Sequence, residues 1–493
     1  MTTTAPDEPS APPAARWSPQ HHWGGEPRDG DTQRWIDRFD PADGEPVGRV
    51  PCAEPSDVRR AVAAARAARA AWAGTSASAR SALLHEAADR VAAMRDELAR
   101  RQVLEMGKPI GDALGGVDAA VGTMRQFAEL GPLHQGRTLQ GDPGAIDTVH
   151  HVPRGVAAVI TPWNDPVAIA AQGIAANLAV GNTVVCKPSE RASFSVAHMI
   201  DAFDHLPAGV LNLVLGDAAT GVALVDEDID VVVFTGSVRA GRAVAARCGP
   251  RLVHSILELG GNDAVVVDEG VDPVWAASQI ATGGFANGGQ ICVSVERVYV
   301  HRAVADDVVV ALVDEATTRR TGGGLDPDTQ LAPLVDREHR ELVHEHVVDA
   351  VERGARCLVG GRVPDGRGAH YPATVLVDVP TDARILREET FGPVVPIVVV
   401  DDFQRGLELA AETEYGLAAT VLTPDQHHAL DAARRLPVGT LKVNAVFGGA
   451  PGGSADPHGS SGSGLGYGPG LLDELTRQRV IHMEPAPRPA HRS

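Results

Sequence analysis

The sequence predicts an α/β protein in which a parallel, doubly wound sheet forms the first of two domains. Short apolar runs rich in β-branched residues recur at 156–160 (VAAVI), 183–187 (TVVCK), 210–215 (VLNLVL) and 231–234 (VVVF). Helix-compatible segments such as PVAIAAQGIAANLAV lie between these runs. Continuous apolar strands that are joined by crossover helices are typical of a parallel sheet covered on both faces.

Two segments precede this sheet. Residues 1–20 consist largely of Pro, Ala, Ser and Thr, and such a composition does not offset the entropy lost on ordering, so we expect a disordered tail. From Ser56 to Leu130, apolar residues recur three and four positions apart. This spacing predicts a set of amphipathic helices, one of which ends at Gly107.

A second group of strand-like runs follows the first sheet. The runs are AVVV at 264–267, ERVYVH at 296–301 and PIVVV at 396–400, and the helical segment DDVVVALVDEATTR lies among them. They predict a second α/β domain over roughly residues 260–440. A chain of 493 residues is too long for one small core, which agrees with two domains or more.

Composition and charge exclude several classes of protein. Lys and Arg number 44 against 64 Asp and Glu, and the net charge of −20 argues against nucleic acid as a partner. No basic segment followed by an apolar stretch opens the chain, and no apolar run reaches the length of a membrane helix. We therefore expect a cytoplasmic protein with no membrane partner. Five scattered cysteines without CxxC spacing indicate free thiols, and neither a disulfide framework nor a metal site.

One of these cysteines, Cys292, lies in a context suited to catalysis. It ends the Gly-containing turn FANGGQIC, which follows the helical run PVWAASQIATGG. A thiol attacks a carbonyl group as a thiolate, so an active cysteine is expected where backbone N–H groups or a helix terminus lower its pKa. Taken alone, the pattern favours a buried structural cysteine.

A candidate base lies upstream of this cysteine. The run SILELGGND places Glu258 at the end of an apolar strand, directly before two glycines. A carboxyl group in such a place, with few charges nearby, has a raised pKa and is suited to general-base catalysis. An ordinary solvated glutamate in a loop is the alternative.

Together, the motifs ELGG and FxNxGQxC resemble the base and nucleophile of the aldehyde dehydrogenase superfamily. The resemblance extends from FDPADGEPVGRVP at Phe39 through LEMGKP at 104–109 to RQRVIHM near the end of the sequence. It implies that the chain oxidises an aldehyde to a carboxylic acid with NAD. By this resemblance Cys292 forms a thiohemiacetal and then a thioester, and Glu258 activates the water that hydrolyses the thioester.

The motif PWNDP follows the predicted strand VAAVI, at the carboxyl edge where α/β sheets place ligands. A tetrahedral intermediate carries an oxyanion that needs donors. The resemblance makes the side-chain amide of Asn164 one donor and the backbone N–H of Cys292 the other, although Asn164 alone reads as a turn residue.

Two roles are open for Asp165. Its carboxylate faces the substrate and favours a polar or cationic aldehyde, or it caps the helix that starts at Pro166, and the Asp-Pro pair favours the cap.

No GxGxxG motif marks a dinucleotide site. Instead, VVVFTGSVRAG resembles the FTGSxxxG turn of the family, in which N–H groups at a helix N-terminus approach a pyrophosphate, and a plain strand-to-helix connection is the alternative. Lys187 and Glu190 in TVVCKPSE are suited to the adenosine ribose hydroxyls, and a carboxylate there disfavours a 2′-phosphate, so we expect NAD over NADP. In EETFGPV, the resemblance assigns the nicotinamide ribose to Glu389 and the nicotinamide face to Phe391. The cofactor contacts implied by the resemblance are Trp163, Lys187, Ser189, Glu190, Gly216, Gly236, Ser237, Gly241, Leu259, Gly260, Glu389 and Phe391.

The resemblance also implies a domain organisation and an assembly. It divides the chain into a Rossmann-like NAD-binding domain, an α/β catalytic domain and a small β bridging element for oligomerisation. These cover residues 21–133 with 153–260, residues 261–443, and residues 134–152 with 464–485. The bridging element implies a homodimer or a homotetramer, and composition does not distinguish the two.

The sequence departs from the family pattern near its end and around the predicted pocket. Family tails commonly read PFGGxKxSGxG, whereas this chain has PHGSSGSGLG, with His458 and Ser460 substituted and the lysine lost. Ile169 and Gln172 stand where relatives often carry aromatic residues, which suggests a non-aromatic pocket with some polarity.

Two other functions stay open. A CoA-dependent semialdehyde dehydrogenase lacks the base that Glu258 supplies, and a catalytically silent nucleotide-binding relative would not need Cys292.

Overall fold

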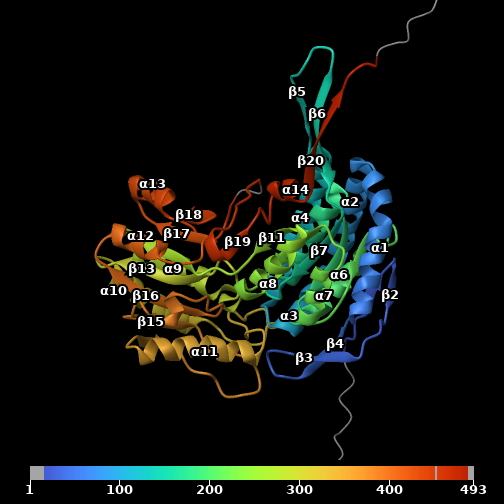
Figure 1. Ribbon diagram of the computed structural model, residues 1–493. Helices are drawn as coiled ribbons and strands as arrows, with labels where there is room; N and C mark the ends of the chain where they lie inside the picture. The colour runs from blue at the N-terminus through green and yellow to red at the C-terminus, as the bar shows by residue number, and fades with distance from the viewer. Residues whose placement is uncertain (1–15, 450–451, 487–493) are drawn as a thin grey trace, which may run out of the picture.

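The computed structural model describes residues 16–449 and 452–486, which form two α/β lobes and a protruding arm (Figure 1). Of the predicted disordered tail, residues 1–15 lie outside the described residues. Residues 16–20 belong to the fold, because the backbone N–H of Trp17 donates to the carbonyl of Val47 at 3.0 Å and the Trp17 ring packs against Phe194. The prediction of a tail up to residue 20 was therefore wrong for residues 16–20.

The first sheet has the parallel core that the apolar runs predict. Its eight strands are ordered β19-β11-β10-β7-β8-β9-β1-β2, and the strands from β7 to β11 run parallel. Every residue of β7 and β8 is buried, as expected for strands covered on both faces. The strands are β1 His21–Trp23, β2 Glu26–Arg28, β7 Val156–Thr161, β8 Thr183–Pro188, β9 Leu211–Leu213, β10 Val231–Thr235, β11 His254–Glu258 and β19 Gly462–Ser463.

Helices cover both faces of this sheet because side chains alternate along each strand. In β7, Val159 packs in one core cluster with α2 to α6, whereas Ala158 packs in another with α1, α7 and α8. The segment predicted as amphipathic helices forms α1 to α4, and Gly107 ends α3 with φ of 87°. The helices are α1 Pro55–Gly74, α2 Ala77–Ala93, α3 Arg95–Met106, α4 Ile110–Leu133, α5 Pro166–Val180, α6 Ser193–Ile200, α7 Ala218–Asp226 and α8 Val238–Cys248, with short 3-10 turns at Asp201–Phe203 and Gly249–Arg251.

The second lobe repeats this three-layer plan. Its seven-stranded sheet has the order β14-β15-β16-β13-β12-β17-β18, with α9 and α10 on one face and α12 and α13 on the other. The strands are β12 Asp263–Val267, β13 Val295–His301, β14 Arg356–Val359, β15 Thr374–Val377, β16 Val394–Val400, β17 Ala418–Leu422 and β18 Thr440–Val443. The helices are α9 Pro273–Phe285, α10 Ala305–Thr318, α11 Arg337–Glu352, α12 Phe403–Ala411 and α13 Gln426–Arg435, with 3-10 turns η3 Ala286–Gly289, η4 Arg384–Leu386 and η5 Gly459–Ser461.

The two sheets meet where the strands of the first sheet end and those of the second begin. The chain leaves β11 at Glu258 and enters β12 at Asp263, so the carboxyl edge of the first sheet faces the amino edge of the second. In the first sheet the chain runs from β7 outward to β9 and then returns to β10 on the other side of β7. The carboxyl ends of β7 and β10 therefore form the topological switch point where doubly wound sheets bind ligands.

A three-stranded antiparallel sheet forms the arm that projects from the first lobe (Figure 1). It consists of β5 Arg137–Leu139, β6 Ile146–Pro153 and β20 Thr476–Met483, and the short helix α14 Gly470–Glu474 leads into β20. A separate hairpin is formed by β3 Arg34–Phe39 and β4 Pro46–Cys52. Among the described residues, none of the helices combines the length and the apolar character needed to cross a membrane.

The packing of α10 gives a test of the second core. Leu312 is fully buried against this core, whereas Val310, two residues earlier on the same helix, is 70% exposed. We expect Leu312→Ala to lower the free energy of unfolding by about 2–5 kcal/mol, since it leaves a cavity, and Val310→Ala to change it by less than about 0.5 kcal/mol. Urea unfolding followed by circular dichroism measures both. Equal effects of the two variants would contradict the packing of α10.

Candidate active site

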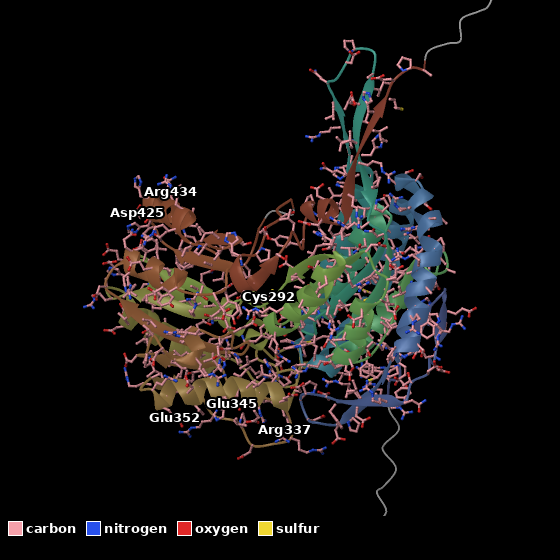
Figure 2. The ribbon with its side chains drawn as sticks, in the orientation of Figure 1. Cys292, Arg337, Glu345, Glu352, Asp425 and Arg434 are labelled. Carbon is pink, nitrogen blue, oxygen red and sulfur yellow. The ribbon has the colours of Figure 1, made fainter. Side chains whose placement is uncertain are left out.

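Cys292 lies between the two lobes, in the loop that joins η3 to β13 (Figure 2). The chain reaches this position through a tight reversal, in which Asn287, Gly288 and Gly289 have φ of 48°, 65° and 73°. Glycine adopts such left-handed angles most readily. At Gly289 there is also no room for a side chain, because a Cβ atom would lie 2.1 Å from the carbonyl oxygen of Gly392. The glycines of FANGGQIC therefore position the cysteine.

The thiol of Cys292 is held in its neutral form. Burial raises its pKa to about 12, and the carboxyl groups of Asp263, Glu258 and Glu389 act in the same direction. The backbone N–H of Val293 has an opposing but smaller effect. The Gly-containing turn predicted a lowered pKa for Cys292, and this prediction was wrong because burial and nearby carboxyl groups outweigh the backbone dipoles. Cys292 is nonetheless partly exposed, whereas Cys52, Cys186 and Cys248 are buried.

Glu258 ends β11, and its side chain lies in the same interior. One oxygen, Oε1, accepts a hydrogen bond from the backbone N–H of Gly466 at 3.0 Å. Burial raises the pKa of the Glu258 carboxyl to about 8, with a further increase from Asp456 and a decrease from the Gly466 hydrogen bond. The structure therefore brings Glu258 close enough to Cys292 for the charge of one to act on the other, as the paired motifs predict.

The C-terminal tail docks beside Glu258 in spite of its altered sequence. The carbonyl of Ser461 accepts a hydrogen bond from Leu259 N–H at 2.9 Å, and the hydroxyl of Ser461 donates to the carbonyl of Gly260 at 2.8 Å. Gly462 and Ser463 then form β19 against β11. A Cβ atom on Gly466 would lie 2.1 Å from Oε1 of Glu258, so a side chain at this position would displace the Glu258 carboxyl group. These contacts use mainly the backbone, which explains why the substituted motif still docks.

Asn164 follows β7 and points toward the cysteine loop. Its side-chain Nδ2 donates to the backbone carbonyl of Gln290 at 3.1 Å. The backbone carbonyl of Asn164 accepts a hydrogen bond from Nδ2 of Asn287 at 3.2 Å. An amide group carries two N–H donors, so one remains after the bond to Gln290. Within residues 16–449 and 452–486, no hydrogen bond engages the backbone N–H of Cys292. Among the described residues, the Asn164 amide and the backbone N–H of Cys292 thus each keep an unused donor, and Asn164 is held to the loop that carries Cys292.

Asp165 precedes α5 but does not cap it through its side chain. The structure contains no hydrogen bond from the Asp165 carboxylate to the helix. Instead, Oδ1 of Asp165 accepts a hydrogen bond from Nζ of Lys108 at 2.9 Å, and the Lys108 side chain is 7% exposed. Asp165 therefore takes the N-cap position of α5 with Pro166 directly after it, as predicted, but its side chain binds Lys108 and not the helix end, since a buried ammonium group needs a charged partner.

The residues expected to bind the adenosine end of a dinucleotide follow β8, β9 and β10. Nζ of Lys187 is buried, donates to the carbonyl of Pro188 at 3.0 Å and lies 4.0 Å from Oε2 of Glu190. Burial lowers the pKa of Lys187. Ser189 lies between them, and its hydroxyl accepts a hydrogen bond from the backbone N–H of Arg191 at 3.2 Å. Gly216 follows β9 with φ of 141°, and a Cβ atom at this position would lie 2.2 Å from Oγ1 of Thr220.

The turn after β10 lies beside β11. The backbone N–H of Gly236 donates to the carbonyl of Glu258 at 3.1 Å, and the hydroxyl of Ser237 caps α8 by accepting from Ala240 N–H at 3.3 Å. A Cβ atom on Gly241 would lie 2.3 Å from Cδ2 of Leu259, so α8 approaches the ELGG turn closely only because residue 241 is glycine. The N-terminus of α8 therefore faces the same edge as the base.

Glu389 and Phe391 reach this edge from the second lobe. Oε1 of Glu389 accepts a hydrogen bond from Gly261 N–H at 3.0 Å, and burial raises the pKa of Glu389 to about 8. Phe391 has φ of 54°, and its ring meets the ring of Trp163 edge-on with centroids 5.3 Å apart. The resemblance predicted all three residues as cofactor contacts, and the structure places Glu389 against Gly260 and Phe391 against Trp163.

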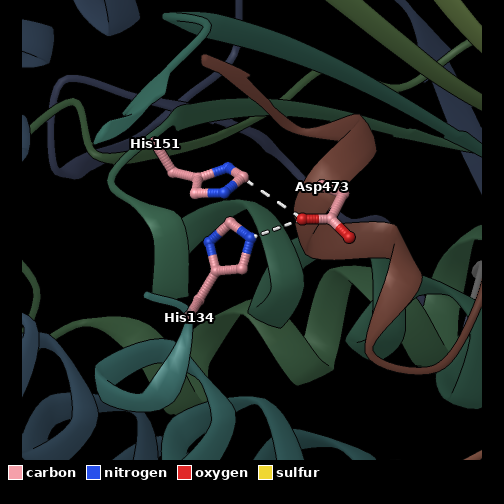
Figure 3. A group of neighbouring side chains, drawn as sticks. All are labelled: His134, His151 and Asp473. Atoms are coloured by element: carbon pink, nitrogen blue, oxygen red, sulfur yellow. Dashed lines mark hydrogen bonds and ion pairs between the residues drawn. The ribbon is translucent and has the colours of Figure 1, made fainter. Parts of the chain in front are cut away.

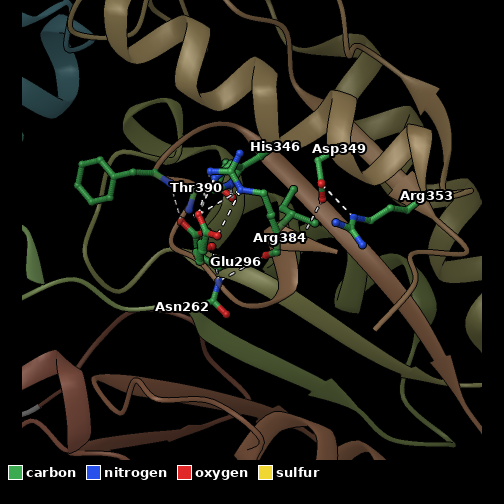
Figure 4. A network of polar contacts seen from close by, with 10 residues as sticks. Asn262, Glu296, His346, Asp349, Arg353, Arg384 and Thr390 are labelled. Atoms are coloured by element: carbon green, nitrogen blue, oxygen red, sulfur yellow. Dashed lines mark hydrogen bonds and ion pairs between the residues drawn. The ribbon is translucent and has the colours of Figure 1, made fainter. Parts of the chain in front are cut away.

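Glu296, which the sequence analysis did not identify, holds this loop in place (Figure 4). Its carboxyl oxygens accept hydrogen bonds from Thr390 N–H at 2.7 Å and Phe391 N–H at 2.8 Å. From the other side, Nδ1 of His346 on α11 lies 3.1 Å from the hydroxyl of Thr390. Burial raises the pKa of Glu296 to about 7. An acidic residue at the start of an otherwise apolar strand, as in ERVYVH, was the signal in the sequence.

The comparisons with known proteins agree with this geometry. The sequence matches the aldehyde dehydrogenase family over residues 28–481. It is 34% identical over 427 residues to the NADP(+)-dependent succinate-semialdehyde dehydrogenase of Escherichia coli, and the match covers 85% of this chain and 88% of that protein. It is also 34% identical over 463 residues to the NAD(+)-dependent benzaldehyde dehydrogenase of Pseudomonas putida, with 91% and 93% covered.

The fold agrees as well. The solved structure of an NAD-dependent aldehyde dehydrogenase from Sinorhizobium meliloti superposes with a TM-score of 0.93 at 33% identity, and the match covers 99% of each chain. The two α/β lobes and the parallel sheets predicted from the sequence are therefore confirmed. The chain belongs to the aldehyde dehydrogenase family, whose members are NAD(P)-dependent oxidoreductases that oxidise aldehydes.

Proposed function

We propose that this chain oxidises a non-aromatic aldehyde to its carboxylic acid through a thioester on Cys292 that water hydrolyses. The thiol of Cys292 releases its proton to solvent, and the thiolate attacks the carbonyl carbon, so that a C–S bond forms and an electron pair moves to the carbonyl oxygen. The Asn164 amide and the Cys292 backbone N–H stabilise this oxyanion. After the thiohemiacetal is oxidised to the thioester, Glu258 accepts a proton from the water that attacks the thioester carbon, and the C–S bond breaks with its electron pair returning to sulfur.

The position of Glu258 is the observation that carries this proposal. Its carboxyl group is partly buried and acts on the charge of Cys292, and its pKa is about 8, so it exchanges a proton near neutral pH, as a general base must. Transfer of the acyl group to CoA would need no base for water. A catalytically silent relative would have no reason to keep the carboxyl group, the thiol and the free amide donor of Asn164 together.

The edge of the first sheet fits a nicotinamide dinucleotide. Donor and acceptor side chains at Lys187 and Glu190 suit ribose hydroxyls, and the N-terminus of α8 at Gly236 and Ser237 suits a pyrophosphate. When bound, NAD supplies the electron acceptor for oxidation of the thiohemiacetal. We propose NAD over NADP, because the carboxylate of Glu190 would repel a phosphate on the adenosine ribose.

The surroundings of Asn164 favour a polar, non-aromatic substrate. Asp165 is paired with Lys108, so it does not present an unpaired charge to a cationic aldehyde. Gln172 on α5 donates to the carbonyl of Gly466, and Ile169 lies one helical turn from Asp165. No aromatic side chain comes from these positions of α5, so a flat aromatic aldehyde would lack stacking partners there.

We further propose a cytoplasmic homodimer or homotetramer that forms through the bridging element. The arm is only three strands, and it exposes apolar side chains at Ile146, Val480 and Met483, which are 57%, 65% and 51% exposed. Such a sheet gains stability from a partner. The five free thiols suit a reducing compartment. Light scattering on the purified chain tests the assembly, and a monomer would contradict it.

A panel of aldehydes tests the proposed reaction. We expect purified protein with NAD to oxidise aliphatic aldehydes and semialdehydes faster than benzaldehyde, and to release free acid without CoA, because Glu258 provides for hydrolysis. Absorbance of NADH measures the rate, and chromatography identifies the acid. Strict dependence on CoA would overturn the hydrolytic route, and absence of turnover in protein that binds NAD would favour a binding function.

Two cysteine variants serve as the matched control for this panel. Cys292→Ala should abolish turnover and leave the affinity for NAD largely unchanged, because it removes the nucleophile alone. Cys357→Ala should retain activity, since Cys357 is exposed on β14 in the second lobe. Activity in the Cys292 variant would show that another group attacks the aldehyde.

The raised pKa of Glu258 predicts the pH dependence of hydrolysis. Below pH 8 the carboxyl group carries a proton and does not accept one from water, so the rate of thioester hydrolysis should rise with pH, with a midpoint of about 8. In Glu258→Gln, hydrolysis should slow by about 10²–10⁴-fold and lose this dependence, so that acyl-enzyme accumulates. Rapid quenching followed by mass spectrometry measures the acyl-enzyme. A profile unchanged in the variant would contradict the assignment of the base.

The contact between Gly466 and Glu258 gives an independent test. A Cβ atom at residue 466 would lie 2.2 Å from Cγ of Glu258, so Gly466→Ala must displace the carboxyl group. We expect hydrolysis to slow by about 10²-fold with NAD affinity unchanged, because a shift of about 1 Å misplaces the base. Ser463→Ala, at an exposed residue of the same tail, is the control. Wild-type hydrolysis in Gly466→Ala would show that the tail does not position the base.

A further inference from the structure

Three side chains with metal-binding groups meet at the base of the arm (Figure 3). His134 follows α4, His151 lies on β6, and Asp473 lies on α14. Nε2 of His134 is 2.8 Å from Oδ1 of Asp473, and Nδ1 of His151 is 3.9 Å from the same oxygen. One ligand atom from each residue lies within 4.8 Å of the other two.

We propose that His134, His151 and Asp473 bind one Zn²⁺ ion, with water completing the coordination. Two imidazoles and a carboxylate with an open position form a common zinc ligand set. Bonds of about 2.0–2.2 Å place two tetrahedral ligands about 3.3 Å apart. The two observed separations from Asp473 lie on either side of this value, and all three ligand atoms lie within 4.8 Å of one another, so side-chain rotations that bring the two imidazoles closer complete the site.

The charges of the cluster favour binding of a metal cation over protonation of the two histidines. The two imidazole rings lie 4.2 Å apart between centroids, so two protonated rings would repel each other. Burial lowers the pKa of His151, and His134 lowers it further, while Asp473 opposes this. A neutral imidazole is the form that binds metal. One divalent ion neutralises the carboxylate without placing positive charge on both rings.

The cluster is open to solvent on one side. The side chain of Asp473 is 64% exposed, whereas each histidine side chain is 13% exposed. An ion can therefore arrive from water and keep water ligands. Binding replaces the contact of 3.1 Å between Nδ1 of His151 and the hydroxyl of Thr476, which retains its own hydrogen bond to the carbonyl of Leu472 at 2.9 Å.

The ion would connect segments that are far apart in sequence. His134 and Asp473 are separated by 339 residues. A bound ion therefore links the end of α4, the start of the arm and the helix that leads into β20, and it fixes the arm to the first lobe. A ligand that binds only the folded state also stabilises the fold by mass action.

Metal titration tests this site without aldehyde turnover. The full chain carries Cys292→Ser, so that the active-site thiol does not bind the ion. We expect one equivalent of Zn²⁺ by calorimetry, an increase of a few degrees in the unfolding temperature, and a visible absorption band when Co²⁺ replaces Zn²⁺. His151→Ala and Asp473→Asn should each weaken binding by at least about 10-fold. His150→Ala, at the exposed neighbour on β6, should bind as the parent does.

The unfolding temperature without metal shows whether each variant keeps its fold. If His151→Ala does not fold, Asp473→Asn decides, because its side chain lies largely in solvent. Absence of Zn²⁺ binding by the parent would overturn the proposal. Binding of equal affinity in the parent, His151→Ala and Asp473→Asn would also overturn it, since the ion would then lie elsewhere.

Discussion

The turn at Gly260 and Gly261 is the constraint on which the rest of the site depends. A Cβ atom on Gly260 would lie 2.2 Å from Oε2 of Glu389, and one on Gly261 would lie 2.6 Å from the carbonyl oxygen of Cys292. At Gly261 the obstacle is backbone, so only glycine allows this approach, whereas a side chain at residue 260 would displace the carboxyl group of Glu389. Because the crossing is short, Glu258 of one lobe and Cys292 and Glu389 of the other lie close together without a linker between them.

The region around this turn is rich in carboxyl groups, and their burial has a common effect. The pKa values of Glu258, Glu296 and Glu389 are all raised by burial, and that of Asp263 is raised well above its usual range. Four like charges in one interior would cost much more free energy than four neutral acids. The same surroundings keep Cys292 as a thiol, so the resting nucleophile is less open to oxidation than a thiolate would be.

Local motifs made much of this architecture predictable from sequence. The apolar runs predicted the parallel strands, because the spacing of the apolar residues and the length of each run can be read from a short stretch of sequence. Contacts between distant segments were not predictable in this way. Glu296 binds backbone groups 94 and 95 residues away, and Gly466 meets Glu258 across 208 residues. The Asp-Pro pair marked the start of α5, but the ion pair of Asp165 was not predictable, since its local sequence did not reveal that Lys108 would be buried beside it.

The docking of the tail on Glu258 has a consequence for the order in which the enzyme acquires its activity. During synthesis Cys292 and Glu258 emerge well before Gly466, whose N–H group binds the Glu258 carboxyl, and before β19, which covers the edge of β11. A chain that is still on the ribosome, or one that is truncated before the tail, therefore carries the nucleophile with an incompletely held base. The last part of the polypeptide to be made completes the hydrolytic machinery, so an unfinished chain is not a fully working enzyme.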